Sequence, residues 1–211
     1  MNNENEPKIP GIKVILIGDS GVGKTSLINV AIGYKFNETE SVTFSNSFVQ
    51  KLLEIDNKTY KLNIWDTIGQ EKYERLTKLF FKNSKIIILV YDKSFKETFK
   101  RLDFWYKEVK ETLDTEFILA IAGNKDDKED KNEDVDEDEA REYAKKLNAK
   151  FKMVSAKTNA IGFIDFLKEL VIDYINKIGE KNNNKNIILS KKKFKKKKKK
   201  CMSMVTPFIL F

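Results

Sequence analysis

Residues 18–25 read Gly18-Asp19-Ser20-Gly21-Val22-Gly23-Lys24-Thr25, which fits the phosphate-binding pattern G-x-x-x-x-G-K-[ST]. Several inward-pointing backbone N–H groups hold a phosphate well, and glycines let the chain curl around it because they carry no Cβ atom. In a loop of this kind Lys24 reaches the β- and γ-phosphates, and the hydroxyl of Thr25 binds Mg²⁺. The pattern therefore predicts a protein that binds a nucleoside triphosphate.

The segments on either side of this loop support the prediction. Residues 12–17 are apolar in the manner of a strand, and residues 26–32 can form a helix. Such a helix would direct its N-terminal N–H groups at the phosphates. A glycine-rich turn without function is the alternative, but it would not require a strand before it and a helix after it.

Strands and helices alternate along most of the remaining chain. Asp56-Asn57 is typical of a hairpin turn, and residues 86–91 are typical of a strand buried on both faces of a parallel sheet. We expect strands at residues 12–17, 47–55, 58–65, 86–91, 117–123 and 151–154. We expect helices at residues 26–32, 72–81, 95–113 and 161–178, and another whose first turn lies within the acid-rich residues 126–142 and which ends at 147. This order predicts an α/β, three-layer P-loop NTPase fold with a mostly parallel sheet of about six strands and helices on both faces.

Two of the expected helices have an apolar face that we assign to the core. In the helix at 95–113 the spacing of three or four residues brings together Phe99, Leu102, Trp105, Tyr106 and Val109. In the last helix the apolar residues are Phe163, Phe166, Leu167, Leu170, Ile172, Tyr174 and Ile175. We interpret the aromatic residues in both as core and not as a ligand-binding box.

The chain length of 211 residues predicts one domain. We place the domain at residues 12–178, between a disordered lead-in at 1–11 and a hypervariable polybasic tail at 179–211. The formal net charge is +8, but residues 191–200 contain nine lysines and no acid, so the rest of the chain has a net charge of −1. The excess positive charge therefore lies in the tail, and we expect no nucleic-acid-binding surface on the domain.

Several features favour a cytoplasmic protein. Cys201 is the only cysteine, which excludes an intramolecular disulfide. Residues 1–10 lack the apolar segment of a secretory signal, and Asn2 is incompatible with N-myristoylation. No apolar run approaches the length that spans a bilayer.

The tail combines an Asn-rich spacer at 181–186 with the lysine run, Cys201 and the apolar residues among 202–211. We interpret it as a tether to an anionic membrane, because lysines near such a surface contribute on the order of 1 kcal/mol each. An acylated Cys201 or the apolar side chains after it would supply the hydrophobic part of the tether. Two alternatives stay open. The lysines could form a nuclear-import signal, or the last ten residues could extend past the true end of the protein.

Four further stretches fall in loops that can share one site with residues 18–25. They are Asn124-Lys125-x-Asp127, Ser155-Ala156-Lys157, Asp66-Thr67-x-Gly69-Gln70 and the isolated Thr43. Together with the phosphate-binding loop, they make residues 12–178 resemble a small GTPase of the Ras superfamily. Residues 61–67, 72–76 and 89–92 are similar to the strand and switch signatures of its Rab branch.

The resemblance implies a guanine site. Asp127 would select the base, because a carboxylate accepts hydrogen bonds from the ring N–H and the exocyclic amine, which adenine cannot donate in that geometry. Asn124 would tie this loop to the phosphate loop, and the stem of Lys125 would lie over the base. A backbone N–H within Ser155-Ala156-Lys157 would meet the guanine oxygen, and Phe36 would pack against the other side of the base.

The resemblance also implies a γ-phosphate and Mg²⁺ site. Asp66 would hold Mg²⁺ through water, the Gly69 N–H would contact the γ-phosphate, and Gln70 would orient the attacking water as the catalytic residue. Thr25 and Thr43 would bind Mg²⁺, the latter only when the γ-phosphate is present. The further nucleotide contacts implied in the phosphate loop are Ser20, Gly21, Val22, Gly23, Lys24 and Ser26.

We therefore expect a Rab-like switch that binds GTP or GDP with Mg²⁺, hydrolyses GTP slowly and acts in vesicle and membrane trafficking. Exchange factors, GTPase-activating proteins and effectors would read the switch loops around residues 37–48 and 67–81. The polybasic tail would hold the protein peripherally on membranes, or would direct it to the nucleus if the import interpretation is right.

Three departures from the family pattern matter. Residue 68 is Ile where the family usually has Ala, and residue 45 is Ser where it usually has Gly. These two motivate an alternative function, an interaction module locked on GTP or GDP with negligible turnover. Cys201 is followed by ten residues, unlike the terminal cysteines of Rab chains, which argues against standard prenylation. A P-loop kinase or ATPase that uses adenine is a third reading, which Asp127 disfavours.

Overall fold

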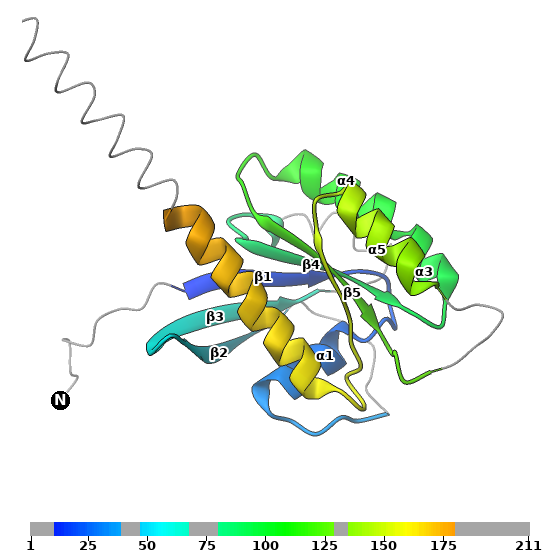
Figure 1. The fold of residues 1–211 in the computed structure, drawn as a ribbon, viewed down its shortest axis with the longest axis horizontal. Helices are drawn as coiled ribbons and strands as arrows, with labels where there is room; N and C mark the ends of the chain where they lie inside the picture. The colour runs from blue at the N-terminus through cyan, green and yellow to red at the C-terminus, as the bar shows by residue number, and fades with distance from the viewer. Residues whose placement is uncertain (1–10, 39–46, 68–79, 129–134, 180–211) are drawn as a thin grey trace, which may run out of the picture. The chain divides into compact units, whose positions relative to one another are not determined.

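A six-stranded sheet with the strand order β2-β3-β1-β4-β5-β6 forms the middle layer of the fold (Figure 1). The computed structural model describes residues 11–38, 47–67, 80–128 and 135–179. The strands are β1 Gly11–Ile17, β2 Ser47–Ile55, β3 Lys58–Asp66, β4 Ile86–Asp92, β5 Ile118–Asn124 and β6 Lys150–Met153. β2 and β3 pair as an antiparallel hairpin, and the other neighbouring strands pair in parallel. The predicted α/β fold with a mostly parallel sheet is therefore confirmed.

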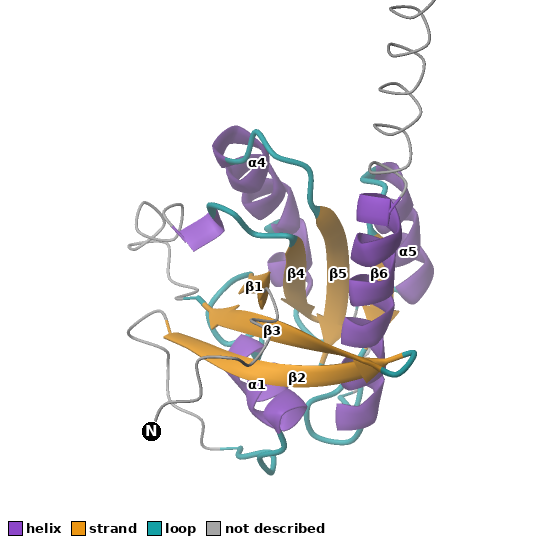
Figure 2. Cartoon of the chain, turned by 90° about the vertical axis from the view of Figure 1, so that its left-hand side faces the viewer, coloured by secondary structure: helices purple, strands orange, loops and turns teal. Residues whose placement is uncertain are grey.

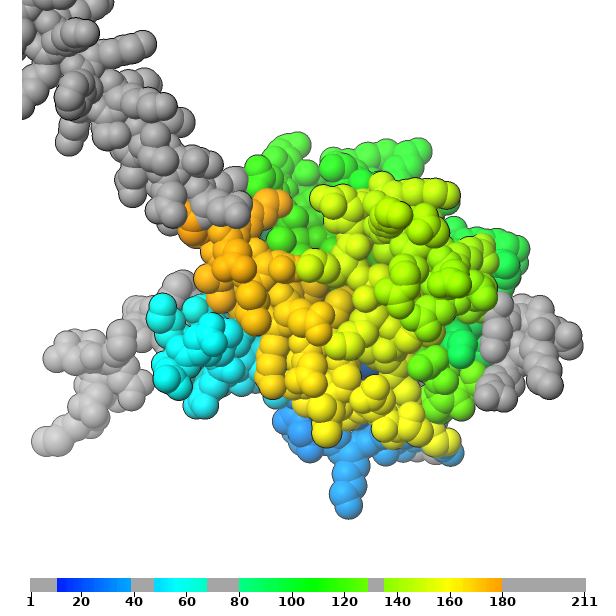
Figure 3. Space-filling model, in the orientation of Figure 1, coloured from blue at the N-terminus to red at the C-terminus, as the bar shows by residue number. Residues whose placement is uncertain are grey.

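Helices cover the two faces of this sheet (Figure 1). The labelled helices are α1 Lys24–Ile32, α3 Lys96–Lys100, α4 Leu102–Thr112 and α5 Glu137–Lys146. Residues 160–179 are also helical. Figure 2 shows the sheet from the side, with α1 and α4 on opposite sides of it. In the space-filling view of Figure 3, side chains fill the space that the ribbons leave open.

The core on one face of the sheet is built from alternate strand residues, because side chains alternate between faces along a strand. The strand residues in this core are Ile15, Ile17, Ile87, Leu89, Tyr91, Leu119 and Ile121. The helices α3 to α5 contribute Phe99, Leu102, Trp105, Val109, Ala140 and Ala144. All seven residues of β4 are buried, as the uninterrupted apolar run predicted for a central strand.

The single helix that we expected at 95–113 is divided into α3 and α4 at Arg101. The backbone of Arg101 stays in the right-handed helical region, with φ −71° and ψ −10°, and its N–H still donates to the carbonyl oxygen of Glu97 over 3.1 Å, so the chain continues in helical form. Its predicted apolar face is mostly correct, because Phe99, Leu102, Trp105 and Val109 are buried. Tyr106 is only partly buried, since it follows Trp105 directly and points about 100° away around the helix.

The last helix begins at residue 160, one residue before the predicted start. Its core residues are Phe163, Phe166, Leu167, Leu170 and Val171. We expected Ile172 on this face, but its side chain is 40% exposed, because the helical period of 3.6 residues gives that place to Val171.

The chain divides into two compact units, residues Met1–Tyr174 and Ile175–Phe211. In the second unit the structure describes residues 175–179, which are helical. Within the described ranges, no helix combines the length and the apolar character that crossing a membrane requires. The helix predicted at 72–81 lies outside the described residues except for 80 and 81, which are helical.

Three parallel strands end in polar residues at the same edge of the sheet. The last residues of β3, β4 and β5 are Asp66, Asp92 and Asn124. Ligands of open α/β sheets bind at the carboxyl ends of the strands. These three strand ends therefore mark the place where a site is expected.

Candidate nucleotide-binding site

A cleft with a volume of about 440 Å³ opens at the carboxyl ends of the strands. It is lined by loops that follow β1, β3, β5 and β6, together with the segment after α1. The residues that line it are Ser20, Gly21, Gly23, Lys24, Thr25, Ser26, Phe36, Asn37, Glu38, Thr67, Asn124, Lys125, Asp127, Lys128, Ala156 and Lys157. Twelve of these sixteen were expected at the site from the sequence; Asn37, Glu38, Thr67 and Lys128 were not.

The loop between β1 and α1 needs glycine at both of its ends. Gly18 has a φ of +155°, and a Cβ atom there would lie 2.1 Å from the carbonyl oxygen of Val90. Gly23 has a φ of +91°, and a Cβ atom there would lie 2.3 Å from Nδ2 of Asn124. Because backbone or a buried amide would have to move in each case, these two glycines allow the loop to lie close to its neighbouring strands.

The Lys24 ammonium is held inside this loop. Its Nζ donates hydrogen bonds of 2.8 Å to the carbonyl oxygens of both Gly18 and Asp19, and the residue is only 6% exposed. Burial lowers the pKa of Lys24 to about 8, although the carboxylates of Asp66 and Asp19 act in the opposite direction. A buried cation is stabilised by negative partners, and a phosphate in the cleft would be such a partner.

Two oxygen-bearing side chains, those of Thr25 and Asp66, meet at the start of α1. The hydroxyl of Thr25 donates to Oδ2 of Asp66 over 2.6 Å. Nearby, the hydroxyl of Thr67 donates to the carbonyl oxygen of Leu16 over 2.7 Å, which fixes the end of β3 against β1. Hydroxyl and carboxylate oxygens suit Mg²⁺, which takes few protein ligands and completes its shell with water and substrate phosphates. In the part of the chain that the structure describes, no group of three or more His, Cys, Asp or Glu residues could hold a metal by itself.

Asn124 joins three loops. Its Nδ2 donates to the carbonyl oxygen of Val22 in the phosphate loop over 2.9 Å. Its Oδ1 accepts a hydrogen bond of 3.2 Å from the backbone N–H of Ala156. The side chain is 1% exposed, so these bonds replace the water that an amide would otherwise bind. The predicted connection between the Asn124 loop and the phosphate loop is thus present in the structure as a hydrogen bond.

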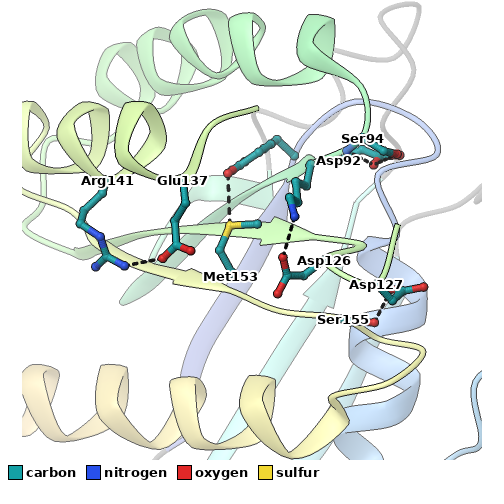
Figure 4. Close-up of polar contacts among 10 residues, drawn as sticks. Asp92, Ser94, Asp126, Asp127, Glu137, Arg141, Met153 and Ser155 are labelled. Atoms are coloured by element: carbon teal, nitrogen blue, oxygen red, sulfur yellow. Dashed lines mark hydrogen bonds and ion pairs between the residues drawn. The ribbon is translucent and has the colours of Figure 1, made fainter. Parts of the chain in front are cut away.

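Asp127 and Ser155 point toward each other across two loops (Figure 4). The Ser155 hydroxyl donates to Oδ1 of Asp127 over 2.5 Å. Its oxygen also accepts from the backbone N–H groups of Lys157 at 3.1 Å and Thr158 at 3.0 Å. Asp127 lines the cleft, whereas Ser155 is buried behind it. Ser155 therefore holds both the Asp127 carboxylate and the turn at residues 155–158 in position from the buried side of the cleft.

Lys125 is held by a residue to which the sequence analysis assigned no role at the site. Its Nζ lies 2.6 Å from Oδ2 of Asp92, the last residue of β4. The other oxygen of Asp92 accepts from the N–H and the hydroxyl of Ser94, at 3.0 and 2.8 Å (Figure 4). A Cβ atom on Gly23 would lie 4.0 Å from Cε of Lys125, so the lysine stem runs along the phosphate loop. The signals for Asp92 were its place in the signature at residues 89–92 and its position at the end of a predicted strand.

The segment after α1 forms another wall of the cleft. Phe36 is half-buried and lines the cleft with Asn37 and Glu38. Glu38 accepts a hydrogen bond from the Lys157 ammonium, and this contact lowers the pKa of Glu38 and raises that of Lys157. Both side chains are exposed, so the pair contributes little to stability. No motif in the sequence marks Glu38.

Among the remaining expected site residues, the structure describes Val22 but not those in the two switch loops. Val22 is fully buried and is not among the residues that line the cleft, and its carbonyl oxygen accepts the hydrogen bond from Asn124. Thr43, Gly69 and Gln70 lie outside the described residues, as does Ile68.

An aromatic cluster lies where the two expected switch loops meet the sheet. The ring of Phe48 stacks on Trp65 with centroids 5.0 Å apart, and Trp65 lies 5.5 Å from the ring of Phe80. The Lys13 ammonium sits 4.7 Å from the Trp65 ring. Phe48 is 50% exposed. The sequence analysis did not single out these residues, because each one alone fits an ordinary strand or helix pattern.

Comparison with known proteins agrees with this geometry. The model of the Ras family matches residues 13–176. Among curated relatives, Ras-related protein Rab-21 of Geodia cydonium is 39% identical over 170 residues, which cover 81% of this chain and 72% of the relative. Human Rab-21 is 39% identical over 163 residues, covering 75% and 72% of the two chains. Human Rab-22A is 37% identical over 167 residues, covering 79% and 83%. The chain belongs to the Ras family of small GTPases, which bind GTP and hydrolyse it.

Proposed function

We propose that this chain is a Rab-like switch that holds GTP or GDP with Mg²⁺ in the cleft, hydrolyses GTP slowly and acts in membrane trafficking. The observation that carries the proposal is the double hydrogen bond of Asn124, to the carbonyl oxygen of Val22 and the N–H of Ala156. It joins the loop that suits a triphosphate to the two loops that suit a guanine base. One cleft can therefore receive both ends of the same nucleotide.

The base, the phosphates and the Mg²⁺ ion of the bound nucleotide would each contact different residues of the cleft. The carboxylate of Asp127 would accept the two N–H groups of guanine, and the backbone N–H of Ala156 or Lys157 would meet its oxygen. Lys24 would exchange its bonds to loop carbonyls for bonds to the phosphates. Mg²⁺ would neutralise charge that develops on the transferred phosphoryl group. Thr25 and Asp66 are the described residues that would hold it, the carboxylate through water.

The conformational switch would depend on residues outside the described ranges. Gly69 would contact the γ-phosphate, and Thr43 would bind Mg²⁺ only while that phosphate is present. Loss of both contacts after hydrolysis would loosen the two switch loops. Gln70 would orient the attacking water. Exchange factors, activating proteins and effectors would read these loops, and the adjoining aromatic cluster of Phe48, Trp65 and Phe80 would give them an apolar anchor.

The trafficking role is supported by the relatives named Rab-21 and Rab-22A, at 37–39% identity. Peripheral attachment to an anionic membrane through residues 179–211 would fit that role. Which compartment and which effectors the chain serves would be decided by the switch loops and the tail.

A nucleotide-locked module with negligible turnover is a second candidate. Ile68 favours it, because a branched side chain next to Gly69 would restrict the backbone movement that brings Gln70 to the water. The nucleotide would then act as a structural ligand, and partners would recognise a fixed conformation.

The test is to purify the full chain, denature it and identify the released nucleotide by chromatography, then to follow single-turnover hydrolysis of GTP with Mg²⁺. We expect GDP or GTP to co-purify and GTP to be hydrolysed slowly, with Gln70→Leu slower still. Release of adenine nucleotide, or equal competition by ATP, would overturn the guanine assignment. Bound GTP that is not hydrolysed by either protein would establish the locked module instead.

A further inference from the structure

The phosphate loop is hydrogen-bonded to two residues of the α3–α4 region, Arg101 at the junction of the two helices and Trp105 within α4. The indole N–H of Trp105 donates a hydrogen bond of 2.7 Å to Oδ1 of Asp19. The Nε of Arg101 donates to the same oxygen over 3.3 Å. Trp105 and Arg101 come from a helical region more than eighty residues further along the chain, so this contact joins two distant elements at the loop.

The two donors are themselves held in place. Trp105 is only 1% exposed, and its ring belongs to the core beneath α3, α4 and α5. The Arg101 guanidinium lies 4.4 Å from the centroid of the Phe104 ring, and Phe104 packs edge-on against Trp105. An indole N–H fixed by core packing is a rigid donor, which defines the position of its acceptor.

Asp19 is in direct contact with the phosphate-binding machinery. Its carbonyl oxygen accepts a hydrogen bond from Lys24 Nζ over 2.8 Å. The next two residues, Ser20 and Gly21, line the cleft, whereas Asp19 does not. The backbone of Asp19 therefore belongs to the phosphate loop while its carboxylate is turned toward α3 and α4.

The direction of this carboxylate matters for an anionic ligand. A triphosphate carries several negative charges, and a carboxylate free to turn toward it would repel it and would compete for the Lys24 ammonium. The Arg101 charge and the Trp105 N–H both favour the orientation seen in the structure. The contact therefore stabilises a loop that can accept phosphates.

We propose that Trp105, assisted by Arg101, is a positioning residue for the phosphate site and acts through Asp19; this inference rests on the proposed function. Trp105 would then have two roles, because its ring packs in the core and its indole N–H holds the Asp19 carboxylate. This contact also links the surface of α3 and α4 to nucleotide affinity, since any change that moves Trp105 moves the partner of the Asp19 carboxylate.

The test measures release of the fluorescent N-methylanthraniloyl derivative of GDP from the full-length chain with Mg²⁺. Trp105→Phe keeps an aromatic ring in the core but removes the N–H. We expect it to release the nucleotide about tenfold faster, the order of effect of one hydrogen bond to a charged group. In an Asp19→Asn background, where no carboxylate can be set free, Trp105→Phe should change the rate less than twofold.

Two further variants separate positioning from general loss of packing. Tyr143→Phe removes a similar bond, from the Tyr143 hydroxyl to Oδ1 of Asp103 at 2.7 Å, away from the phosphate loop. It should leave the release rate unchanged. Arg101→Gln keeps the core intact and should accelerate release by a smaller factor that vanishes at high salt.

An equal effect of Trp105→Phe with and without the Asp19 carboxylate would overturn the inference, as would an unchanged rate in both Trp105→Phe and Arg101→Gln. If Trp105→Phe does not fold, as judged by its thermal melt, the salt-dependent effect of Arg101→Gln decides. A parent chain that does not retain the labelled GDP would refute the proposed function, and this inference with it. Retention by the parent without dependence on Asp19 would refute the inference alone.

Discussion

The carboxylate of Asp127 accepts a hydrogen bond from the hydroxyl of Ser155, with 2.5 Å between Oδ1 and Oγ. The two residues stand 28 positions apart in the sequence, in the loops after β5 and β6. Because the same Ser155 oxygen accepts two backbone N–H groups, the carboxylate and the turn at residues 155–158 are fixed together. A guanine base bound by Asp127 would therefore meet groups that are already in position.

Replacing the carboxylate tests base selection. Asp127→Asn should lower the affinity for GDP and GTP about a hundredfold, the order expected for two hydrogen bonds to a charged group. It should raise the affinity for xanthine nucleotides, because the amide can donate to the xanthine oxygen. The measurement is a fluorescence titration with labelled GDP, in competition with GTP, XTP and ATP.

The neighbouring acid provides the control for that variant. Asp126 forms an exposed ion pair with Lys93 at 3.1 Å and does not line the cleft (Figure 4). Asp126→Asn should bind GDP as the parent does. Unchanged GTP binding in Asp127→Asn would remove the assignment of guanine selection to Asp127.

The Asn124 side chain should contribute to the stability of the fold as well as to binding. Asn124→Ala leaves the buried carbonyl oxygen of Val22 and the N–H of Ala156 without these partners, at a cost of about 2–4 kcal/mol in the free energy of unfolding. The expected result is a lower melting temperature and a smaller stabilisation by added GDP. Thermal melts with and without GDP measure both quantities.

An exposed asparagine gives the matched control. Asn159 accepts from the Gly162 N–H over 2.9 Å at the start of the last helix, where solvent can replace the bond. Asn159→Ala should cost no more than about 1 kcal/mol, as for other helix-start contacts, and should leave the GDP effect intact. A melting temperature of Asn124→Ala equal to that of the parent would contradict the role of this side chain in joining the loops.

The strand pattern and the loop motifs were enough to predict the sheet and most of the cleft. Motif residues lie at the ends of predicted parallel strands, and topology brings those ends to one edge. The polar contacts between distant residues were not predictable. Core spacing assigned Trp105 to a buried face, but it carried no information on where the indole N–H points. Asp92 and Glu38 have partners, Lys125 and Lys157, that only the folded chain brings near.

The sequence also did not predict that the helix expected at residues 95–113 is divided in two. Nothing in residues 95–113 breaks helical periodicity, so the division into α3 and α4 at Arg101 was not predictable. Arg101 donates a hydrogen bond to Asp19, and no pattern in the sequence predicted this contact.

Ile68 provides a test of the hydrolysis rate. The prediction comes from the sequence, because residue 68 lies outside the described ranges. A branched side chain beside Gly69 should hinder the rearrangement that brings Gln70 to the attacking water, so Ile68→Ala should hydrolyse GTP faster. Single-turnover hydrolysis measures the rate. The double variant with Gln70→Leu should be slow, and an equal or slower rate for Ile68→Ala alone would remove the steric argument.

The tail prediction rests on charge and apolar content. Nine lysines at 191–200 precede Cys201 and an end that contains Met204, Val205, Phe208, Ile209, Leu210 and Phe211. Lysines beside an anionic leaflet contribute on the order of 1 kcal/mol each, and one weak hydrophobic signal beside them gives reversible attachment. A nuclear-import signal would use the same lysines but would require no lipid.

We expect the full chain to co-sediment with vesicles that contain phosphatidylserine at low salt, and a version that ends at Ser190 to remain in solution. Binding should fall steeply as salt rises past physiological strength, where the Debye length drops below about 8 Å. A third version that ends at Cys201 separates the two contributions, because it keeps the lysines and loses the apolar end. Equal sedimentation of the full chain and the Ser190 version, or binding that ignores salt and lipid charge, would rule out the tether and favour the import interpretation.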